Sequence, residues 1–177
     1  MSIWRHLRAV TLLPAMMTIV VPTAILLARR DVRIGWRLPF PFAVLPLVLG
    51  AALLAAGVTL MASTIRLFAT AGRGTLAPWD PTQRLVVRGV YRYVRNPMIT
   101  GVLCILVAEA AAFGSLALLG WSALFFIVNA VYIPLVEEPG LERRFGEGYR
   151  VYKQHVPRWL PRRTPWRAEP NAGILPE

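Results

Sequence analysis

The feature that most constrains this chain is a set of three long stretches without a charged residue, at 9–28, 38–65 and 110–136. A fourth uncharged stretch, 96–108, is separated from the third by Glu109 alone. A helix needs about 20 mostly apolar residues to cross the hydrocarbon core of a bilayer, and within that core every backbone polar group must be satisfied internally. The chain is therefore predicted to be an all-α integral membrane protein.

The composition agrees with this prediction and excludes two other classes of protein. Hydrophobic residues make up 56% of the 177 residues and charged residues only 16%, against about 45–50% and about 25% in soluble domains. A soluble globule and a disordered chain are both excluded. The net charge of +11 is expected of loops that face anionic lipid, so we predict membrane lipids and no nucleic acid as partners. The single cysteine excludes an internal disulfide framework, and no metal site is predicted.

The last apolar region, 98–136, is too long for one crossing. A single helix of that length would extend about 58 Å, nearly twice the thickness of the hydrocarbon core. A turn is therefore predicted at Gly114-Ser115. The first span is predicted to be retained, because its apolar run is too long for a signal peptide and no small-x-small cleavage site follows it. About four transmembrane helices result, at 9–28, 43–65, 98–113 and 116–136.

Basic residues predict the orientation of these helices. The N-terminus, the 66–97 loop and the C-terminal segment share one side of the predicted topology and carry 16 of the 20 basic residues. The other side carries four, Arg29, Arg30, Arg33 and Arg37. Because cytoplasmic loops of membrane proteins carry an excess of basic residues, we expect the larger set to face the cytoplasm. The expected location is the bacterial inner (cytoplasmic) membrane, as a multi-pass protein.

Two polar segments have patterns of their own. Between Arg84 and Arg95, apolar and aromatic residues alternate with arginines, which predicts a short interfacial helix or turn lying against the lipid headgroups. Pro97 then suits the first turn of the third span.

The second polar segment follows the fourth predicted span. Leu141, Phe145, Tyr149 and Tyr152 recur at helical spacing and predict one continuous helix with an aromatic face. Gly146 within that helix costs about 1 kcal/mol relative to alanine. We therefore expect the helix to pack closely there on a cofactor or on another backbone.

These two segments together resemble the isoprenylcysteine carboxyl methyltransferase and phospholipid methyltransferase superfamily. The resemblance covers roughly residues 66–161, and the closing Val156-Pro157-Arg158-Trp159-Leu160-Pro161 is similar to the tail of that family. Where the family commonly has Arg-His-Pro-x-Tyr, this chain has Arg95-Asn96-Pro97-Met98-Ile99. The pattern that carries the resemblance is Tyr91-Arg92-x-x-Arg95-Asn96-Pro97, followed some forty residues later by Glu137-Glu138-x-x-Leu141-x-x-x-Phe145-Gly146-x-x-Tyr149-x-x-Tyr152.

The resemblance implies a membrane-embedded methyltransferase that uses S-adenosylmethionine and methylates a lipid-like or small hydrophobic acceptor. The chain is then predicted to divide into two N-terminal transmembrane helices (1–65), a methyltransferase-like region (66–161) and a flexible tail (162–177). In the methyltransferase-like region, the resemblance implies a cytoplasmic C-terminal helix that closes the cofactor site. The implied catalytic residues are Arg95, Asn96 and Glu138. The implied cofactor-binding residues are Tyr91, Arg92, Arg95, Pro97, Glu137, Glu138, Leu141, Phe145, Tyr149 and Tyr152.

Each candidate residue also has a simpler interpretation. A guanidinium suits bidentate capture of a cofactor carboxylate, but juxtamembrane arginines such as Arg92 and Arg95 also anchor lipid phosphates. Glu137 and Glu138 are expected at a helix C-terminus, where carboxylates oppose the helix dipole; they bind cofactor hydroxyl or amino groups, or form a solvated helix end. The aromatic residues are membrane-interface anchors, or an adenine wall and a cation–π surround for a sulfonium.

Three classes of function stay open from the sequence. The first is the methyltransferase, with an isoprenylcysteine carboxylate (O-methylation) or a phospholipid amine (N-methylation) as the acceptor. The second is a membrane NAD(P)H-dependent reductase of the sterol-reductase type, and the third is a non-catalytic membrane scaffold.

Glu109 lies inside the third predicted span. A carboxylate there raises the free energy of membrane insertion by at least about 2.5–3.5 kcal/mol, so Glu109 is expected to face a polar cavity or another helix.

Overall fold

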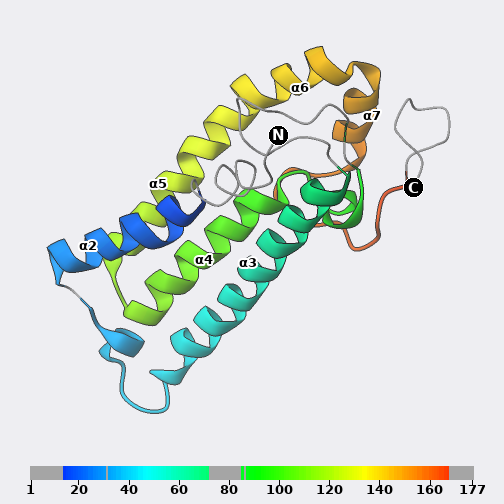
Figure 1. The fold of residues 1–177 in the computed structure, drawn as a ribbon. Coiled ribbons are helices and arrows are strands. Elements are labelled where there is room, and N and C mark those ends of the chain that lie inside the picture. Colours follow the sequence, from blue (N-terminus) through cyan, green and yellow to red (C-terminus); the bar gives the residue numbers. More distant parts are fainter. Residues whose placement is uncertain (1–13, 31, 72–84, 86, 168–177) are drawn as a thin grey trace. The chain divides into compact units, whose positions relative to one another are not determined.

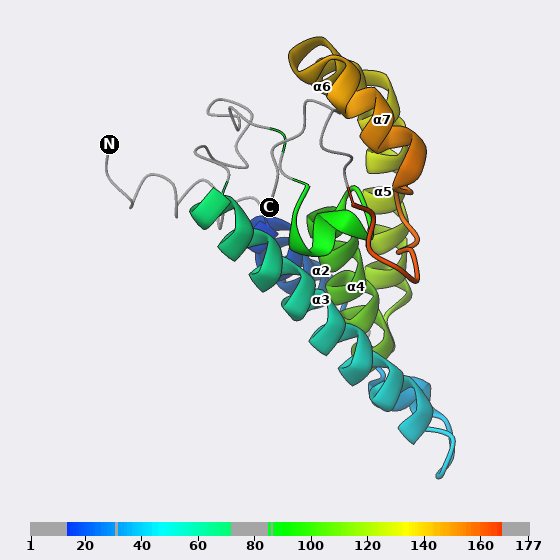
Figure 2. The same cartoon turned by 90° about the vertical axis from the view of Figure 1, so that its right-hand side faces the viewer.

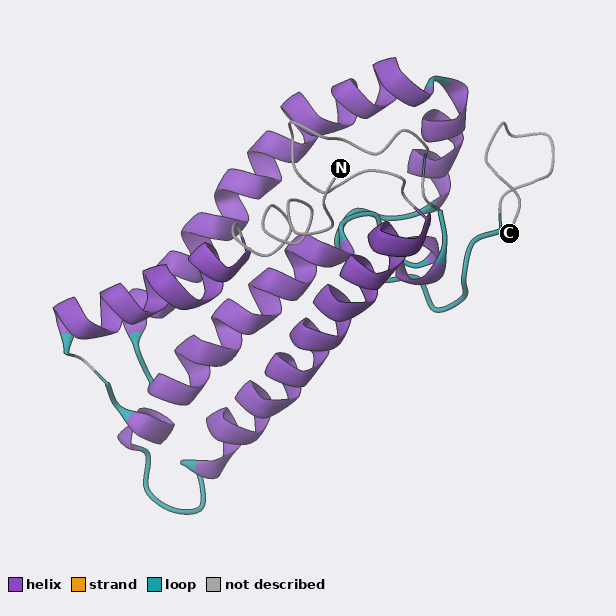
Figure 3. Cartoon of the chain, viewed as in Figure 1, coloured by secondary structure: helices purple, strands orange, loops and turns teal. Residues whose placement is uncertain are grey.

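The computed structural model describes residues 14–30, 32–71, 85 and 87–167. These residues form helices, turns and irregular segments and contain no β-strand, as Figure 3 shows, so the predicted all-α class is confirmed for them. Residues 9–13 of the first predicted span lie outside the described residues. The elements, in chain order and labelled as in Figure 1, are η1 (Met16–Val20), α2 (Val21–Arg29), η2 (Ile34–Arg37), α3 (Val44–Ala71), η3 (Gly89–Arg92), α4 (Pro97–Phe113), α5 (Leu116–Tyr132), η4 (Ile133–Glu137), α6 (Glu138–Phe145) and α7 (Glu147–His155).

Two of the described helices are long and apolar enough to cross a membrane. They are Val44–Leu67 and Leu116–Phe145, the second of which runs through α5, η4 and α6. The helix Pro97–Phe113 is apolar but shorter. Large apolar side chains on the two long helices are exposed, among them Leu49 (54%) and Val128 (54%). A helix of a soluble protein would bury such a stripe, so this exposure fits a lipid environment.

The chain divides into two compact units, each described here by itself. Among the described residues, unit 1 contains 62–71, 85, 87–98 and 130–167, and unit 2 contains 14–30, 32–61 and 99–129. Unit 2 therefore draws residues from both sides of the predicted boundary at residue 65.

Small residues set the helix packing in unit 2. A Cβ atom added to Gly57 of α3 would lie 2.7 Å from the carbonyl oxygen of Gly101, and one added to Gly101 of α4 would lie 3.0 Å from the carbonyl oxygen of Gly57. Glycine at both positions therefore lets the two backbones touch, as small residues do between membrane helices.

The turn between α4 and α5 lies where the sequence predicts it. Gly114 has a φ of +58°, which favours glycine. The hydroxyl of Ser115 accepts a hydrogen bond from the N–H of Leu118 at 3.4 Å at the start of α5. The predicted hairpin of 98–113 and 116–136 is confirmed as a pair of helices, whereas four transmembrane helices stay a prediction.

The helix of the fourth predicted span does not end at Val136, and this corrects the predicted bounds of the helix. The helix passes from α5 through one π-helical turn, η4, directly into α6. Pro134 within that turn has no N–H with which to continue the α-helical hydrogen-bond pattern. Glu138 consequently lies in the first turn of α6, so the expected conflict with the dipole of a helix C-terminus does not arise.

The helix predicted from Leu141 to Tyr152 is also corrected, because it is broken into α6 and α7. Gly146 separates them with a φ of 57° and a ψ of −132°. A Cβ atom at Gly146 would meet nothing within 4 Å. The glycine is therefore favoured by this sharp turn, visible in Figure 2, and close packing is not the reason for it.

Candidate functional site

The two polar segments that carry the resemblance come together in unit 1. The guanidinium Nη1 of Arg95 lies 3.0 Å from the Oε1 of Glu138. The hydroxyl of Tyr152 in α7 donates a hydrogen bond to the backbone carbonyl of Tyr91 at 2.8 Å. Residues some 40 to 60 positions apart thus form one site, as the sequence analysis expects.

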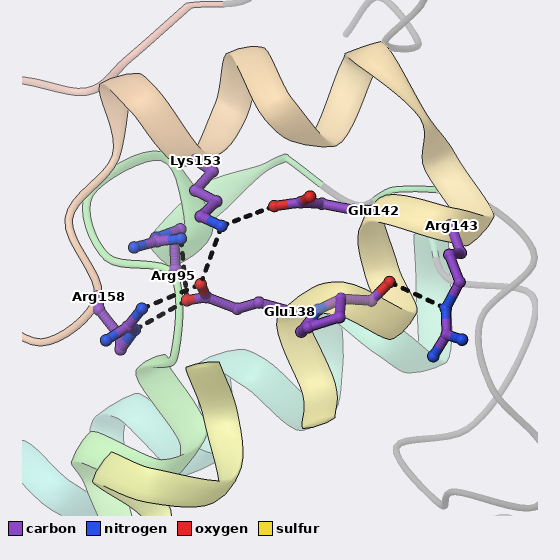
Figure 4. Close-up of polar contacts among 7 residues, drawn as sticks. Arg95, Glu138, Glu142, Arg143, Lys153 and Arg158 are labelled. Carbon is purple, nitrogen blue, oxygen red and sulfur yellow. Dashed lines mark hydrogen bonds and ion pairs between the residues drawn. The ribbon is translucent and has the colours of Figure 1, made fainter. Parts of the chain in front are cut away.

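The centre of this site is the carboxylate of Glu138, whose side chain is only 3% exposed. Arg158 binds it with two hydrogen bonds, from Nε at 2.8 Å and from Nη2 at 2.9 Å. Lys153 Nζ lies 3.4 Å from the same carboxylate and 2.6 Å from Glu142 Oε1. We call Arg95, Glu138, Glu142, Lys153 and Arg158 the polar cluster (Figure 4).

The polar cluster has three cations and two carboxylates, so its formal charge is +1. A carboxylate this deeply buried is stable only when charge and hydrogen bonds compensate it. The hydrogen bond with Glu138 correspondingly raises the pKa of Arg158. Glu138 therefore holds the cationic side chains of three separate segments in place.

Arg95 is the least solvated cation of the polar cluster. Its side chain is 9% exposed, and its Nε is buried and donates no hydrogen bond to any residue that the structure describes. A buried donor without a partner costs about 1–3 kcal/mol. An anionic or carbonyl ligand would satisfy this donor, so Arg95 fits the cofactor carboxylate that the sequence analysis assigns to it.

The aromatic residues of α7 form an interior cluster. Tyr149, Tyr152, Val156 and Trp166 are buried, with Leu141 and Phe145 packed against them. The rings of Tyr149 and Tyr152 lie 6.1 Å apart, and those of Tyr152 and Trp166 lie 5.9 Å apart. These side chains are thus packed against one another.

Burial also changes the acidity of the phenols in this aromatic cluster. It raises the pKa of Tyr149 to about 12, with a further contribution from the nearby charge of Glu138. It likewise raises the pKa of Tyr152 well above the ordinary value. Both phenols are therefore neutral hydrogen-bonding groups at physiological pH.

The segment that follows α7 closes over the first polar segment. We call residues 157–166 the C-terminal strap. The N–H of Arg95 donates to the carbonyl of Pro157, that of Arg162 to Tyr93 and that of Trp166 to Arg92, each at 2.9 Å. Arg92 Nε donates in return to the carbonyl of Trp166 at 2.8 Å.

Part of the segment that was predicted to be a flexible tail belongs to the C-terminal strap. The ring of Trp166 stacks on His155, 5.5 Å away with 19° between the planes. The start of the predicted flexible tail at 162 therefore falls inside this packed segment, and residues 168–177 lie outside the described part of the chain.

A cavity of about 370 Å³ adjoins the first polar segment within unit 1. Its walls are Arg92, Tyr93, Gly89 and Val90, with Ser63 and Leu67 of α3 and Pro165 of the C-terminal strap. The volume lies within the range of about 300–1,000 Å³ that is usual for small-molecule sites. Arg92 and Ser63 supply its polar groups, and the other walls are largely apolar.

The remaining predicted site residues lie outside the polar cluster. Glu137 is exposed, Asn96 is half-buried, and Pro97 is buried at the start of α4. Glu109 belongs to unit 2, where its Oε2 is buried and has no hydrogen-bond partner among the residues that the structure describes.

Sequence reasoning missed Glu142, Lys153, Arg158 and Trp166 as site residues. Two signals were available. Glu142 and Lys153 are 11 residues apart, close to three helical turns, so they share a face of the predicted helix. Arg158 lies in the closing motif that resembles the tail of the family. For Trp166 the sequence offers no signal.

The described residues thus define a largely helical protein with long, exposed apolar helices and a buried charge cluster. Residues 45–148 match the model of the phospholipid methyltransferase family. This match covers more than half of the chain, from the first turn of α3 into α7, and includes Arg95 and Glu138. The chain belongs to the phospholipid methyltransferase family, which confirms the resemblance.

One curated relative is phosphatidylethanolamine N-methyltransferase 1 of Vanderwaltozyma polyspora. It is 32% identical over 84 residues, which cover 43% of this chain and 9% of the relative. The chain therefore spans about a tenth of the length of that relative. No solved structure matches the chain.

Proposed function

We propose that this protein is a membrane-embedded lipid methyltransferase that uses S-adenosylmethionine. The environment of the Arg95 side chain is the observation that supports the proposal. Its guanidinium is nine-tenths buried, is held by Glu138 and keeps a buried donor without a partner in the described structure. Arg95 and Glu138 both lie within the segment that matches the phospholipid methyltransferase family.

The donor set of the site suits the cofactor. A guanidinium binds a carboxylate with charge-assisted hydrogen bonds, so Arg95 and Arg92 are proposed to hold the carboxylate of S-adenosylmethionine. Bound there, the cofactor supplies an activated methyl group on a sulfonium. Glu137 and the half-buried side chains of Leu141 and Phe145 are proposed to contact the remainder of the cofactor.

The protein's own contribution to the reaction is positioning and exclusion of water. Methyl transfer is an in-line displacement that needs no protein nucleophile, so holding the two reactants at attack distance supplies much of the catalysis. The ion pair with Glu138 fixes the side chain of Arg95, and the C-terminal strap fixes the backbone at Arg95 and at Arg92 and Tyr93 before it. Arg95 and Glu138 are largely shielded from water, at 9% and 3% exposed, which strengthens the electrostatic interactions of Arg95.

A phospholipid amine is the proposed acceptor. The family and the name of the relative from V. polyspora both support N-methylation of a lipid headgroup. An isoprenylcysteine carboxylate is the second candidate, because the spaced motif also resembles enzymes that methylate that group. A protonated amine has to give a proton to water before its lone pair can attack the methyl group, whereas an ionised carboxylate is already a nucleophile.

We further propose four transmembrane helices, with the polar cluster on the cytoplasmic side of a bacterial inner membrane. The support is the count of basic residues, 16 of 20, in the N-terminus, the 66–97 loop and the C-terminal segment. Reporter fusions after residues 33, 80 and 167 test this topology. A periplasmic signal at 80 or 167 would contradict it.

The acceptor is tested with membranes that contain the full chain and a radiolabelled methyl donor. Label is expected in phospholipid after extraction, and label in a prenylated peptide alone would favour the carboxylate. Arg95→Ala is expected to lower incorporation at least tenfold. Arg143→Ala is the matched control, because Arg143 is exposed on α6 and its Nε donates a hydrogen bond to the backbone carbonyl of Pro139 at 3.3 Å.

Calorimetric titration of the detergent-solubilised protein separates the classes of function. Binding of S-adenosylmethionine and S-adenosylhomocysteine, without NADPH, is expected. NADPH binding alone would favour a reductase, and no binding would favour a scaffold. Arg92→Ala is expected to weaken the binding of S-adenosylmethionine at least tenfold, or by about 1.4 kcal/mol. Unchanged affinity in both Arg92→Ala and Arg95→Ala would refute the proposal that these arginines bind the carboxylate of the cofactor.

A further inference from the structure

Unit 2 contains an apolar groove between α2 and α5 that the proposed methyl transfer does not use. The groove has a volume of about 650 Å³. Small residues on both helices open it, namely Ala24 and Ala28 on α2 and Ala117 and Gly120 on α5. A Cβ atom at Gly120 would meet nothing within 4 Å, so this part of the wall is open space.

One end of this groove carries a positive charge. Arg29, the last residue of α2, is one of the lining residues and is exposed. The other lining residues are apolar or aromatic. An occupant that matches this arrangement has a long apolar part and an anionic group at one end.

The length of the groove matches one half of a bilayer. From Val21 to Arg29 the α2 wall rises about 12 Å, at 1.5 Å per residue. Half of the hydrocarbon core is about 15 Å thick. An acyl chain that lies along α2 would therefore bring its headgroup close to Arg29.

We propose that the groove is a binding site for a phospholipid, with one acyl chain between α2 and α5 and the phosphate on Arg29. Guanidinium is well suited to phosphate because it forms charge-assisted hydrogen bonds with it. All of the lining residues belong to unit 2, and the observations behind this proposal do not include the polar cluster.

A second copy of the chain is the competing occupant, because small residues also favour contacts between membrane helices. Charge disfavours it. A two-fold contact through the same groove would place the Arg29 side chains of both copies within one apolar interface. Burying two like charges without counter-ions is costly, whereas a phosphate compensates the single charge.

The test measures lipid binding to the full-length protein in mild detergent by native mass spectrometry. The probes are phosphatidylglycerol, diacylglycerol with the same chains, and inorganic phosphate. Gly120→Leu fills the groove, and Arg29→Gln removes the charge. Ala51→Leu, on an exposed position of α3, and Arg30→Gln, at the residue next to Arg29 but outside the lining, are the matched controls.

Phosphatidylglycerol is expected to bind at least tenfold more tightly than diacylglycerol, with no binding of inorganic phosphate alone. Arg29→Gln should abolish that preference, and Gly120→Leu should weaken both lipids at least fivefold, while the two controls bind as the unaltered chain does. Equal lipid binding in all variants would overturn the proposal. So would a dimer that Gly120→Leu dissociates while lipid binding is retained.

Discussion

Replacement of Glu138 by glutamine tests the central claim about the polar cluster. The substitution preserves the shape of the side chain and removes its charge, which leaves Arg95, Lys153 and Arg158 without their shared carboxylate. The side chains of Lys153 and Arg158 are 38% and 27% exposed, so water can solvate them, but that of Arg95 is only 9% exposed. Breaking a buried ion pair by removing one partner costs about 3–5 kcal/mol.

Because two of the three cations regain water, we expect Glu138→Gln to lower the free energy of unfolding by about 3 kcal/mol, at the lower end of that range. The assay is chemical unfolding in mild detergent, followed by tryptophan fluorescence. Glu147→Gln is the control. Glu147 pairs with Arg150 at 3.4 Å, but both side chains are exposed, at 73% and 60%, and such surface pairs contribute about 0–1 kcal/mol.

A double substitution separates stability from binding. Replacing both partners of a buried pair by apolar residues is often neutral or stabilising. Arg95→Met with Glu138→Leu is therefore expected to regain part of the lost stability without regaining S-adenosylmethionine binding. If Glu138→Gln unfolds within about 0.5 kcal/mol of the unaltered chain, as a surface substitution does, the carboxylate does not hold the cluster and the reasoning fails.

Three further predictions concern packing and pH. Gly57→Ala places a Cβ atom 2.7 Å from the Gly101 carbonyl oxygen, so we expect a loss of about 1–3 kcal/mol in the free energy of unfolding. Gly140→Ala is the control and should be neutral or stabilising, because its Cβ atom meets nothing within 4 Å. Equal effects of the two substitutions would contradict the close contact between α3 and α4. Trp166→Ala removes a ring that is 9% exposed and should lower the free energy of unfolding by about 3 kcal/mol, with cofactor affinity reduced in the same variant. A change within about 0.5 kcal/mol, as for a surface substitution, would show that the C-terminal strap is not packed in solution. The pKa of Tyr149 is raised to about 12 in the folded protein from about 10 in the unfolded chain, so its contribution to stability is complete below pH 10 and is lost as the pH rises from 10 to 12. The melting temperature should therefore fall less steeply over that interval in Tyr149→Phe than in the unaltered chain. Parallel curves of melting temperature against pH would refute the burial of this phenol.

The sequence predicted the elements whose signal is local. Apolar stretches and one Gly-Ser pair were enough to predict α3, α4 and α5 and the turn at Gly114, because span length and turn conformation depend on neighbouring residues. The spaced motif likewise identified both segments that contribute to the site. These features need no knowledge of the tertiary structure.

The sequence-based predictions were wrong or incomplete where the structure depends on contacts between distant residues. The helical spacing of Leu141, Phe145, Tyr149 and Tyr152 was real, but Gly146 breaks the helix and the aromatic face becomes an interior cluster. Continuation of the helix beyond Glu137 depends on the π-helical turn at Pro134, for which no sequence rule was available. The partners of Glu138 lie up to 43 residues away along the chain, so periodicity could not pair them.

The C-terminal strap has a consequence for the order in which the protein matures at the ribosome. Arg92 and Trp166, which bond to each other twice, are 74 residues apart. At about 5–20 residues per second, translation needs about 4–15 seconds to proceed from the first to the second. During that interval the nascent chain can already place the α4–α5 hairpin, while the backbone around Arg95 still waits for its last hydrogen-bond partners. Assembly of the charged centre is therefore a late event, and nascent chains arrested before residue 157 should expose Arg95 to proteases or labelling reagents that chains extended past residue 167 resist.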